Sequence, residues 1–299
     1  MPSDQDQTVP PEPSSVLSAA SPIPSQPPVV PKRHHLWLIV LGLWFIVLLG
    51  AGLFYISSLS RKLVVEEKPS LPNVERIKNA GKIIIATDAT YPPMEFVDDN
   101  QMMAGYDIDL GNKIAEKLGV KAEFSSILFD DIFNSLNRRE ADIILSSVTI
   151  NEERKQTVDF SIPYLNAGQV IITLETENSI KSENDLSAKR IAVQKGTTSE
   201  DEALKAAPPD QVLLFDDFIG ATDALIKGEA DAIITDLTNA KGIVDSNQEL
   251  KIAGEPFTEE EYGVVFRKNE DDLIAEINTA LNSLRQQGYL VLLKQKWLE

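Results

Sequence analysis

Cysteine is absent from this 299-residue chain, and its only two histidines, His34 and His35, lie side by side near the N-terminus. The rest of the chain therefore lacks the thiol and imidazole groups on which disulfides, most zinc sites and most nucleophile–base pairs depend. Basic residues are also scarce, since 28 Lys and Arg stand against 46 Asp and Glu, for a formal net charge of −18. Recognition of nucleic acid needs a basic surface. We therefore expect no metal, no cofactor and no nucleic-acid partner, and hydrolytic chemistry is disfavoured.

The N-terminal part of the chain is predicted to contain a tail and an anchor. Residues 1–35 are rich in Pro and Ser and poor in apolar groups, which predicts a disordered tail. Residues 36–58 are predicted to be a transmembrane helix, because 21 consecutive residues in this segment carry no charge and would span roughly 30 Å. The alternative is a cleaved signal peptide, whose apolar region is usually about 7–15 residues long. The longer apolar run favours an uncleaved signal-anchor.

The flanks of this segment do not fix its orientation. Lys32 and Arg33 precede it, and Arg61 and Lys62 follow it within the predicted linker 59–73. The positive-inside rule therefore gives almost no bias. The side of the membrane on which the following residues lie has to be inferred from function.

Beyond the linker, short β-like runs alternate with amphipathic helices, which is typical of parallel α/β sheets. Two pairs of strands resemble each other: residues 140–147 are echoed by 229–236, and residues 82–88 more loosely by 189–195. All four end at polar residues, and open α/β sheets bind ligands beyond the carboxyl ends of their strands. The repeat predicts two similar lobes that face each other across a cleft for a small charged molecule.

Two extended stretches, 166–174 and 261–266, separate the repeated units from each other and from the C-terminal helices. The last helices carry an apolar stripe that begins at Leu273 and continues through Ile277. If these helices pack on the first lobe, the chain crosses between the lobes twice. Two adjacent crossings form a hinge that permits closure around a ligand.

Five motifs, in order along the chain, carry a resemblance to a known family. They are TDATYPPMEF (87–96), GYDIDL (105–110), SSVTINEER (146–154), VDFSIPY (158–164) and KGTT (195–198). On these motifs the chain resembles the extracytoplasmic solute-binding proteins of polar amino-acid ABC importers, bacterial solute-binding protein family 3. The resemblance implies an α/β, two-lobed periplasmic-binding-protein fold of type II that traps one amino acid and is not an enzyme. We place lobe 1 at residues 74–166 and 262–299, and lobe 2 with the hinge strands at residues 167–261.

Arg154 and Asp236 are the predicted partners of the two backbone charges of the amino acid. The planar guanidinium of Arg154 matches a carboxylate, and the residue stands near the start of a predicted helix. The resemblance places a carboxylate at Asp236 for the ligand's ammonium group. The alternatives are a solvated helix face for Arg154 and a helix N-cap for Asp236.

The resemblance implies further contacts around this pair. Ser147 and Thr149 add hydrogen-bond donors, and Thr197 and Thr198 close over the carboxylate from the other lobe. Aromatic rings cover the aliphatic stem of the ligand, although each ring alone is more often part of a core. The full set of predicted ligand-binding residues is Asp88, Tyr91, Phe129, Ser146, Ser147, Thr149, Arg154, Gln194, Thr197, Thr198 and Asp236. The GYDIDL motif is predicted to be structural, with its glycine in a turn and Asp107 or Asp109 as a helix cap.

Asp88 is an additional anion at a strand end, beyond the two charges that balance a zwitterion. A leftover carboxylate favours a cationic or amide side chain on the ligand and disfavours an acidic one. Gln194 would add an amide contact. The alternative is that Asp88 organises the turn at residues 90–93.

We therefore predict a single-pass protein of the cell membrane whose soluble part lies on the extracytoplasmic side. It is expected to bind Arg, Lys, His or Gln and to deliver the amino acid to an ABC permease. Two alternatives use the same fold. A signalling receptor would carry a further domain, which we do not expect here, and an extracytoplasmic dehydratase would need an acid or base beyond the carboxylates already given ligand roles.

Overall fold

A computed structural model describes residues 40–52 and 72–299. Residues 40–52 form a helix with exposed apolar side chains. The predicted tail 1–35, the ends of the predicted transmembrane segment 36–58 and most of the predicted linker 59–73 lie outside the described residues. Among the helices of the two described ranges, none combines the length and apolar composition needed to cross a bilayer. The chain divides into two compact units after residue 68, and the second unit is described below.

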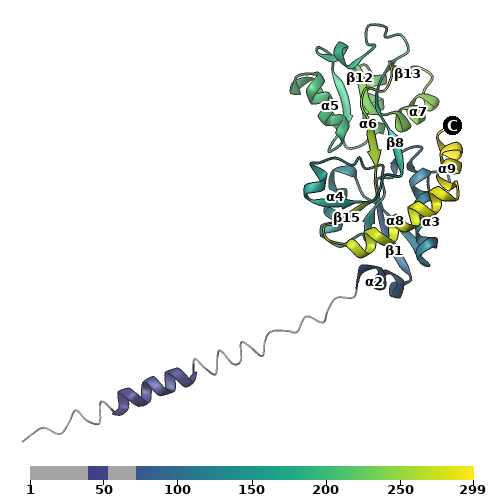
Figure 1. Ribbon diagram of the computed structural model, residues 1–299. Helices are drawn as coiled ribbons and strands as arrows, with labels where there is room; N and C mark the ends of the chain where they lie inside the picture. Colours follow the sequence, from purple (N-terminus) through teal and green to yellow (C-terminus); the bar gives the residue numbers. More distant parts are fainter. Residues whose placement is uncertain (1–39, 53–71) are drawn as a thin grey trace, which may run out of the picture. The chain divides into compact units, whose positions relative to one another are not determined.

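Residues 72–299 contain two five-stranded sheets, and we call the parts built on them lobe 1 and lobe 2 (Figure 1). The order is β5-β1-β6-β15-β7 in lobe 1 and β11-β10-β12-β9-β13 in lobe 2. The strands of lobe 1 are β1 (Lys82–Thr87), β5 (Lys121–Ser126), β6 (Ile143–Ile144), β7 (Val158–Phe160) and β15 (Val265–Arg267). Those of lobe 2 are β9 (Gln169–Leu174), β10 (Ile191–Gln194), β11 (Val212–Phe215), β12 (Ala232–Asp236) and β13 (Leu250–Ala253).

The strand pairs that echo each other in the sequence occupy matching places in the two sheets. In lobe 1, β1 and β6 are parallel neighbours with Ile85 beside Ile143. In lobe 2, β10 and β12 are parallel neighbours with Ile191 beside Ala232. Each pair therefore brings its two polar ends to one edge of its sheet. The predicted two-lobed α/β architecture is confirmed.

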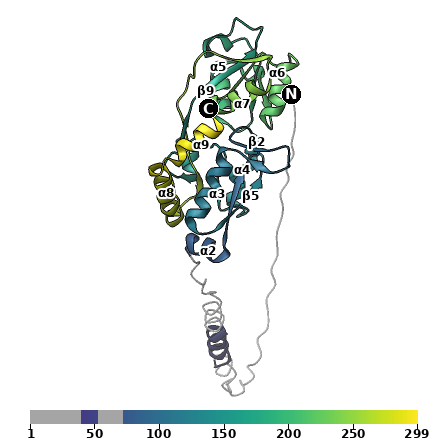
Figure 2. The ribbon, with the colours of Figure 1, turned by 90° about the vertical axis from the view of Figure 1, so that its right-hand side faces the viewer.

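Helices and a small sheet complete the two lobes. Lobe 1 carries α2 (Asn73–Ala80), α3 (Tyr106–Leu118), α4 (Phe129–Asn137), α8 (Asp271–Gln286), α9 (Tyr289–Trp297), the 3₁₀ turn η1 (Arg154–Gln156) and the sheet β2 (Thr90–Tyr91), β3 (Glu95–Val97) and β4 (Met103–Ala104). Lobe 2 carries α5 (Thr198–Ala206), α6 (Phe218–Ile226), α7 (Leu237–Ser246) and the 3₁₀ turns η2 (Glu183–Leu186) and η3 (Pro209–Gln211). The C-terminal helices α8 and α9 pack against α3 (Figure 2), so the chain returns to lobe 1 as predicted.

The two crossings between the lobes are adjacent strands. β8 (Leu165–Ala167) and β14 (Glu260–Tyr262) form an antiparallel pair with Asn166 beside Glu261. The predicted double crossing is confirmed. The predicted lobe boundaries, after residues 166 and 261, fall inside these two strands and stay a prediction.

Gly105 forms the turn that precedes helix α3 of lobe 1. Its φ of 131° suits glycine, and a Cβ there would lie 2.2 Å from the carbonyl oxygen of Met94. No side chain caps α3. The predicted cap by Asp107 or Asp109 is therefore wrong. Asp107 is fully buried, and Asp109 accepts hydrogen bonds from Lys296 and Trp297 of α9.

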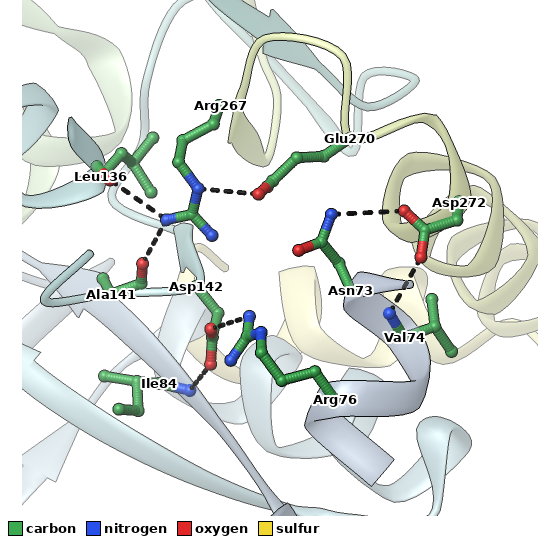
Figure 3. Close-up of polar contacts among 10 residues, drawn as sticks. All are labelled: Asn73, Val74, Arg76, Ile84, Leu136, Ala141, Asp142, Arg267, Glu270 and Asp272. Carbon is green, nitrogen blue, oxygen red and sulfur yellow. Dashed lines mark hydrogen bonds and ion pairs between the residues drawn. The ribbon is translucent and has the colours of Figure 1, made fainter. Parts of the chain in front are cut away.

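Lobe 1 holds the first helix after the linker, α2, through two aspartates (Figure 3). Asp272 of α8 accepts a hydrogen bond from the backbone N–H of Val74 at 3.0 Å. Asp142 accepts one from Arg76 at 2.6 Å and another from the N–H of Ile84 at 2.8 Å. These contacts join α2 to β1 and α8, so the start of the second unit is part of lobe 1 and not a loose extension.

Candidate functional site

The polar strand ends of both lobes face one cavity. Its empty volume, which includes space open to solvent, is about 370 Å³. Its walls contain all eleven residues predicted from the sequence and three that were not predicted. The lining residues are Asp88, Tyr91, Glu95, Phe129, Ser146, Ser147, Thr149, Arg154, Gln194, Thr197, Thr198, Ser199, Phe218 and Asp236.

Arg154 lies on the lobe 1 side and reaches across the cavity. Its guanidinium donates to the carbonyl oxygens of Thr149 at 3.0 Å and Gly196 of lobe 2 at 3.2 Å. Its guanidinium carbon lies 5.6 Å from the centre of the Phe129 ring and 5.4 Å from that of Phe133, within cation–π distance. Arg154 begins the 3₁₀ helix η1, so the predicted helix start at this position is confirmed, although the helix is only three residues long.

Within residues 40–52 and 72–299, no carboxylate forms a salt bridge with the Arg154 guanidinium. Burial lowers the pKa of Arg154, and a guanidinium nevertheless remains charged in proteins. Both of its hydrogen bonds go to neutral carbonyls. A desolvated guanidinium with unused donors is suited to binding a carboxylate.

Asp236 is the matching anion, at the end of β12 in lobe 2. Its Oδ2 accepts hydrogen bonds from Tyr91 at 3.1 Å and from Tyr262. Among the described residues, Oδ1 has no hydrogen-bond partner. Asp236 stands at the N-cap position of α7 without a side-chain cap bond, so the capping interpretation is not borne out. Burial raises the pKa of Asp236 to about 6, because removal from water disfavours its charged form.

Asp88 and Gln194 join the two lobes at the cavity. The Gln194 Nε2 donates to Asp88 Oδ2 at 2.8 Å, and the same oxygen accepts from the N–H of Phe129 at 3.1 Å. Asp88 Oδ1 accepts from the Thr90 hydroxyl at 2.8 Å. Burial raises the pKa of Asp88. The Thr90 contact fits the turn-organising alternative, while the position in the cavity wall fits a ligand contact.

Ser146 and Ser147 contact a carboxylate that the sequence analysis missed. Their hydroxyls donate to Glu95 at 3.0 and 3.3 Å. Glu95 begins β3 and pairs with Tyr91 of β2. A hairpin prediction for residues 90–97, centred on the two prolines, would have placed Glu95 beside Tyr91 and so at the site.

The lobe 2 side of the cavity is formed by the start of α5. Thr197 caps this helix by accepting from the N–H of Glu200, and its hydroxyl donates to the Gln194 carbonyl at 2.7 Å. The Thr198 hydroxyl accepts from Gln169 at 2.9 Å. Helix α5 begins at Thr198. Thr198 and Ser199, the first residues of α5, line the cavity, and a helix N-terminus favours anions.

Two rings from opposite lobes form the apolar wall. The Tyr91 ring centre lies 5.5 Å from that of Phe218, a residue that the sequence analysis did not assign. The Phe129 ring lies against Arg154. The wall can cover an aliphatic stem, and Arg154 and Asp236 can bind the opposite charges of a zwitterion. Within residues 40–52 and 72–299, no group of His, Cys, Asp and Glu side chains has the arrangement of a metal site.

Known proteins are similar to this chain in sequence and in fold. A model of the bacterial extracellular solute-binding proteins, family 3, matches residues 83–299. The L-cystine-binding protein TcyJ of Escherichia coli (strain K12) is 31% identical over 226 residues, which cover 75% of this chain and 85% of that protein.

Several solved structures are also similar to this chain in fold and sequence. A mutant of ArgBP from T. maritima superposes with a TM-score of 0.72 at 38% identity, over 75% of this chain and 98% of that one. An ancestral arginine-binding protein bound to arginine has a TM-score of 0.70 at 41% identity, over 73% of this chain and 99% of that one. An ancestral arginine-binding protein bound to glutamine is equally similar, with a TM-score of 0.70.

Proposed function

This chain belongs to the bacterial extracellular solute-binding proteins of family 3, and we propose that it binds one polar or basic L-amino acid between its lobes. Arginine, lysine, histidine and glutamine are the candidates. We propose further that the bound amino acid is delivered to an ABC permease. The observation that carries the proposal is the placement of Arg154 and Asp236 on opposite sides of one cavity, each with unused capacity for an opposite charge.

In the proposed complex, Arg154 binds the ligand carboxylate with help from Ser147, Thr149, Thr197 and Thr198. Asp236 binds the ammonium group through its free Oδ1. The rings of Tyr91, Phe129 and Phe218 cover the aliphatic stem. Each charged group of the ligand then replaces a solvent contact by a charge-assisted hydrogen bond.

The side chain of the ligand is proposed to point toward Asp88, with Gln194 and Ser146 beside it. Asp88 is 2% exposed, so a charge placed there is felt at low dielectric. An acidic side chain would be repelled. The arginine and glutamine complexes of the ancestral relative support a cationic or amide side chain.

We propose that residues 36–58 anchor the protein in the cell membrane, with the two lobes on the extracytoplasmic side. The support is the uncharged run of 21 residues in the sequence. The relatives described above are named for binding amino acids and not for catalysis, so the chain is not an enzyme.

The experiment that tests the proposed function is a thermal-shift panel of the twenty amino acids with the full-length protein. A ligand that binds only the folded state raises stability by RT ln(1 + [L]/Kd), which is about 2.7 kcal/mol at a hundredfold excess over Kd. We expect a rise for at least one basic or amide amino acid and none for aspartate or glutamate. Unchanged melting with all twenty would contradict the proposal.

A further inference from the structure

Glu95 and Asp107 are two carboxyl groups at the cavity that the proposed ligand contacts do not use. Glu95 lines the cavity and is 1% exposed, and Asp107 of α3 lies behind it and is 0% exposed. Both groups lie within 3.5 Å of the Ser147 hydroxyl. Two carboxyl groups that share one buried hydroxyl partner cannot both ionise without a large cost, so such a pair holds a shared proton.

Ser147 fixes the geometry of this pair. Its N–H donates to Asp107 Oδ2 at 2.8 Å, and its hydroxyl lies 3.3 Å from Glu95 and 3.5 Å from Asp107. The backbone of Ser147 has a φ of 50°, in the left-handed region that residues other than glycine rarely adopt. Tyr164 donates a second hydrogen bond to Asp107 at 2.8 Å. The fold therefore holds both carboxyl groups in place.

No cation compensates the pair in the described part of the chain. The groups that face it are Asp88 at the end of β1, Tyr91 of β2, Tyr106 of α3 and Tyr164 before β8. All are acidic or neutral. Burial raises the pKa of Glu95 well above its usual range and that of Asp107 to about 6, which is consistent with one proton retained near neutral pH.

A ligand that contacts Asp88 also approaches Glu95. The N–H of Asp88 donates to the Ser146 hydroxyl at 2.9 Å, and that hydroxyl donates to Glu95 at 3.0 Å. One serine thus links the backbone of Asp88 to the carboxyl group of Glu95, and both residues line the same cavity. A guanidinium or ammonium group beside Asp88 lies within the field of Glu95 as well.

We propose that the Glu95–Asp107 pair discriminates ligands by the charge of their side chain. A cationic side chain expels the shared proton to solvent and forms an ion pair with the ionised Glu95, whereas a neutral side chain leaves the proton in place. This inference rests on the proposed function and adds a preference for arginine or lysine over glutamine. Because binding of a cationic ligand releases this proton, its affinity rises with pH over the range in which the empty pair is protonated. The affinity for a neutral ligand does not change with pH through this pair.

Calorimetry of the full-length protein tests the proposal. L-Arginine and L-glutamine are titrated in buffers of different ionisation enthalpy from pH 6.5 to 8.5, above the pKa of about 6 of Asp236. The α-amino group contributes equally with both ligands. We expect arginine binding to release roughly half a proton or more at the pH of greatest release, and glutamine binding to release almost none. Equal proton counts for both ligands, or proton uptake with arginine, would overturn the role of the pair.

Two variants distinguish the effect of the Glu95 charge from a structural effect of altering the carboxyl pair. Glu95→Gln should abolish the extra proton release and lower the ratio of arginine to glutamine affinity by about tenfold. Asp107→Asn should lower the pKa of Glu95 by removing the neighbouring negative charge, so the release should shrink while the ratio holds or rises. Glu261→Gln, at an exposed position, is the control for loss of one negative charge and should keep both the release and the ratio. A lowered ratio in Asp107→Asn would overturn the proposal.

The melting temperature of each variant shows whether it folds, and the proton count of the wild-type protein does not depend on any variant. If neither arginine nor glutamine binds the wild-type protein and the amino-acid panel is also negative, the proposed function itself fails. If both bind without a difference in proton count, only the role of the Glu95–Asp107 pair fails.

Discussion

Arg154 and Asp236 are charged residues whose hydrogen-bonding capacity is partly unused in the described part of the chain. The guanidinium donates only to carbonyl oxygens, and Asp236 Oδ1 has no partner among the described residues. Buried charges are costly unless they are paired. A zwitterion supplies an anion to the first residue and a cation to the second, so ligand binding satisfies both.

We expect Arg154→Ala and Asp236→Ala each to weaken amino-acid binding by about 2–5 kcal/mol, because each leaves a desolvated ligand charge unpaired. This corresponds to roughly thirtyfold to several-thousandfold in Kd, measured by calorimetry. Arg154→Lys should restore only part of the affinity, since an ammonium group cannot reproduce the bidentate fork. Lys155→Ala is the control, because the Lys155 ammonium pairs with Glu152 on the surface. Wild-type affinity in both alanine variants would place the site elsewhere.

Asp88→Asn is expected to change which amino acid binds more than whether one binds. Loss of the charge leaves Arg154 and Asp236 intact, so affinity for glutamine should hold or rise. Affinity for arginine or lysine should fall by about 1–3 kcal/mol, as a charge-assisted hydrogen bond becomes a neutral one. A uniform loss across the amino-acid panel, with a lower melting temperature of the empty protein, would favour the alternative in which Asp88 organises the turn through Thr90.

At the scale of residues, the sequence predicted the cavity walls better than the groups behind them. Polar residues at strand ends, such as Asp88 and Asp236, were predicted because carboxyl ends of parallel strands meet at one sheet edge. The resemblance to the family supplied others, such as Tyr91 and Phe129, and all eleven line the cavity. Asp107 was misjudged as a cap, since aspartate is common at helix starts. Its hydrogen bonds come from Ser147 and Tyr164, which are 40 and 57 residues away and leave no local pattern.

At the scale of elements, local signals in two segments were ambiguous. Thr197 with Glu200 and Ser199 with Glu202 share the same capping-box spacing, so the sequence could not choose between two starts for α5. The helix predicted at Arg154 ends after three residues, because β7 begins at Val158 and pairs with β15. Tertiary pairing overrode helix propensity there.

Helix α7 packs against lobe 1 at Gly242, and the third prediction concerns this contact. A Cβ on Gly242 would lie 2.7 Å from the carbonyl oxygen of Pro92, next to Tyr91 in the ligand-covering turn. The two-strand hinge β8–β14 allows the lobes to separate. Gly242→Ala should therefore oppose closure and weaken binding by about 1–3 kcal/mol, the usual cost of overpacking. The empty protein should not lose stability, because alanine favours a helix interior over glycine by about 0.5–1 kcal/mol.

Calorimetry and solution X-ray scattering with saturating ligand check this expectation, since a blocked closure leaves a larger radius of gyration. Gly220→Ala in α6 is the matched control. The atoms nearest to its Cβ would belong to Phe215 and Asp217 of the same lobe, at 3.2 and 3.6 Å. Unchanged affinity and compaction in Gly242→Ala would show that the Pro92 contact does not limit closure.

At the scale of the molecule, the repeat in the sequence predicted two lobes and the chain's double crossing between them. It could not predict that the lobes are in contact. Tyr91 meets Asp236, Gln194 meets Asp88 and Lys195 pairs with Asp130 at 2.7 Å, all across the cleft. Such contacts depend on the relative position of two separate sheets. Periodicity within a strand or helix carries no information about that position.

The last prediction concerns the whole chain in the membrane. Positive charges on both flanks of residues 36–58 balance, so charge alone does not orient the segment. If the lobes bind amino acids for import, they must lie outside the cytoplasm and the N-terminal tail inside. Protease added to intact cells should then remove residues 72–299 and spare the tail, while lysed cells should lose both. The membrane-bound protein should have the mass of the full chain, which a cleaved signal peptide would not give. Protection of the lobes in intact cells would contradict both the orientation and the proposed import function.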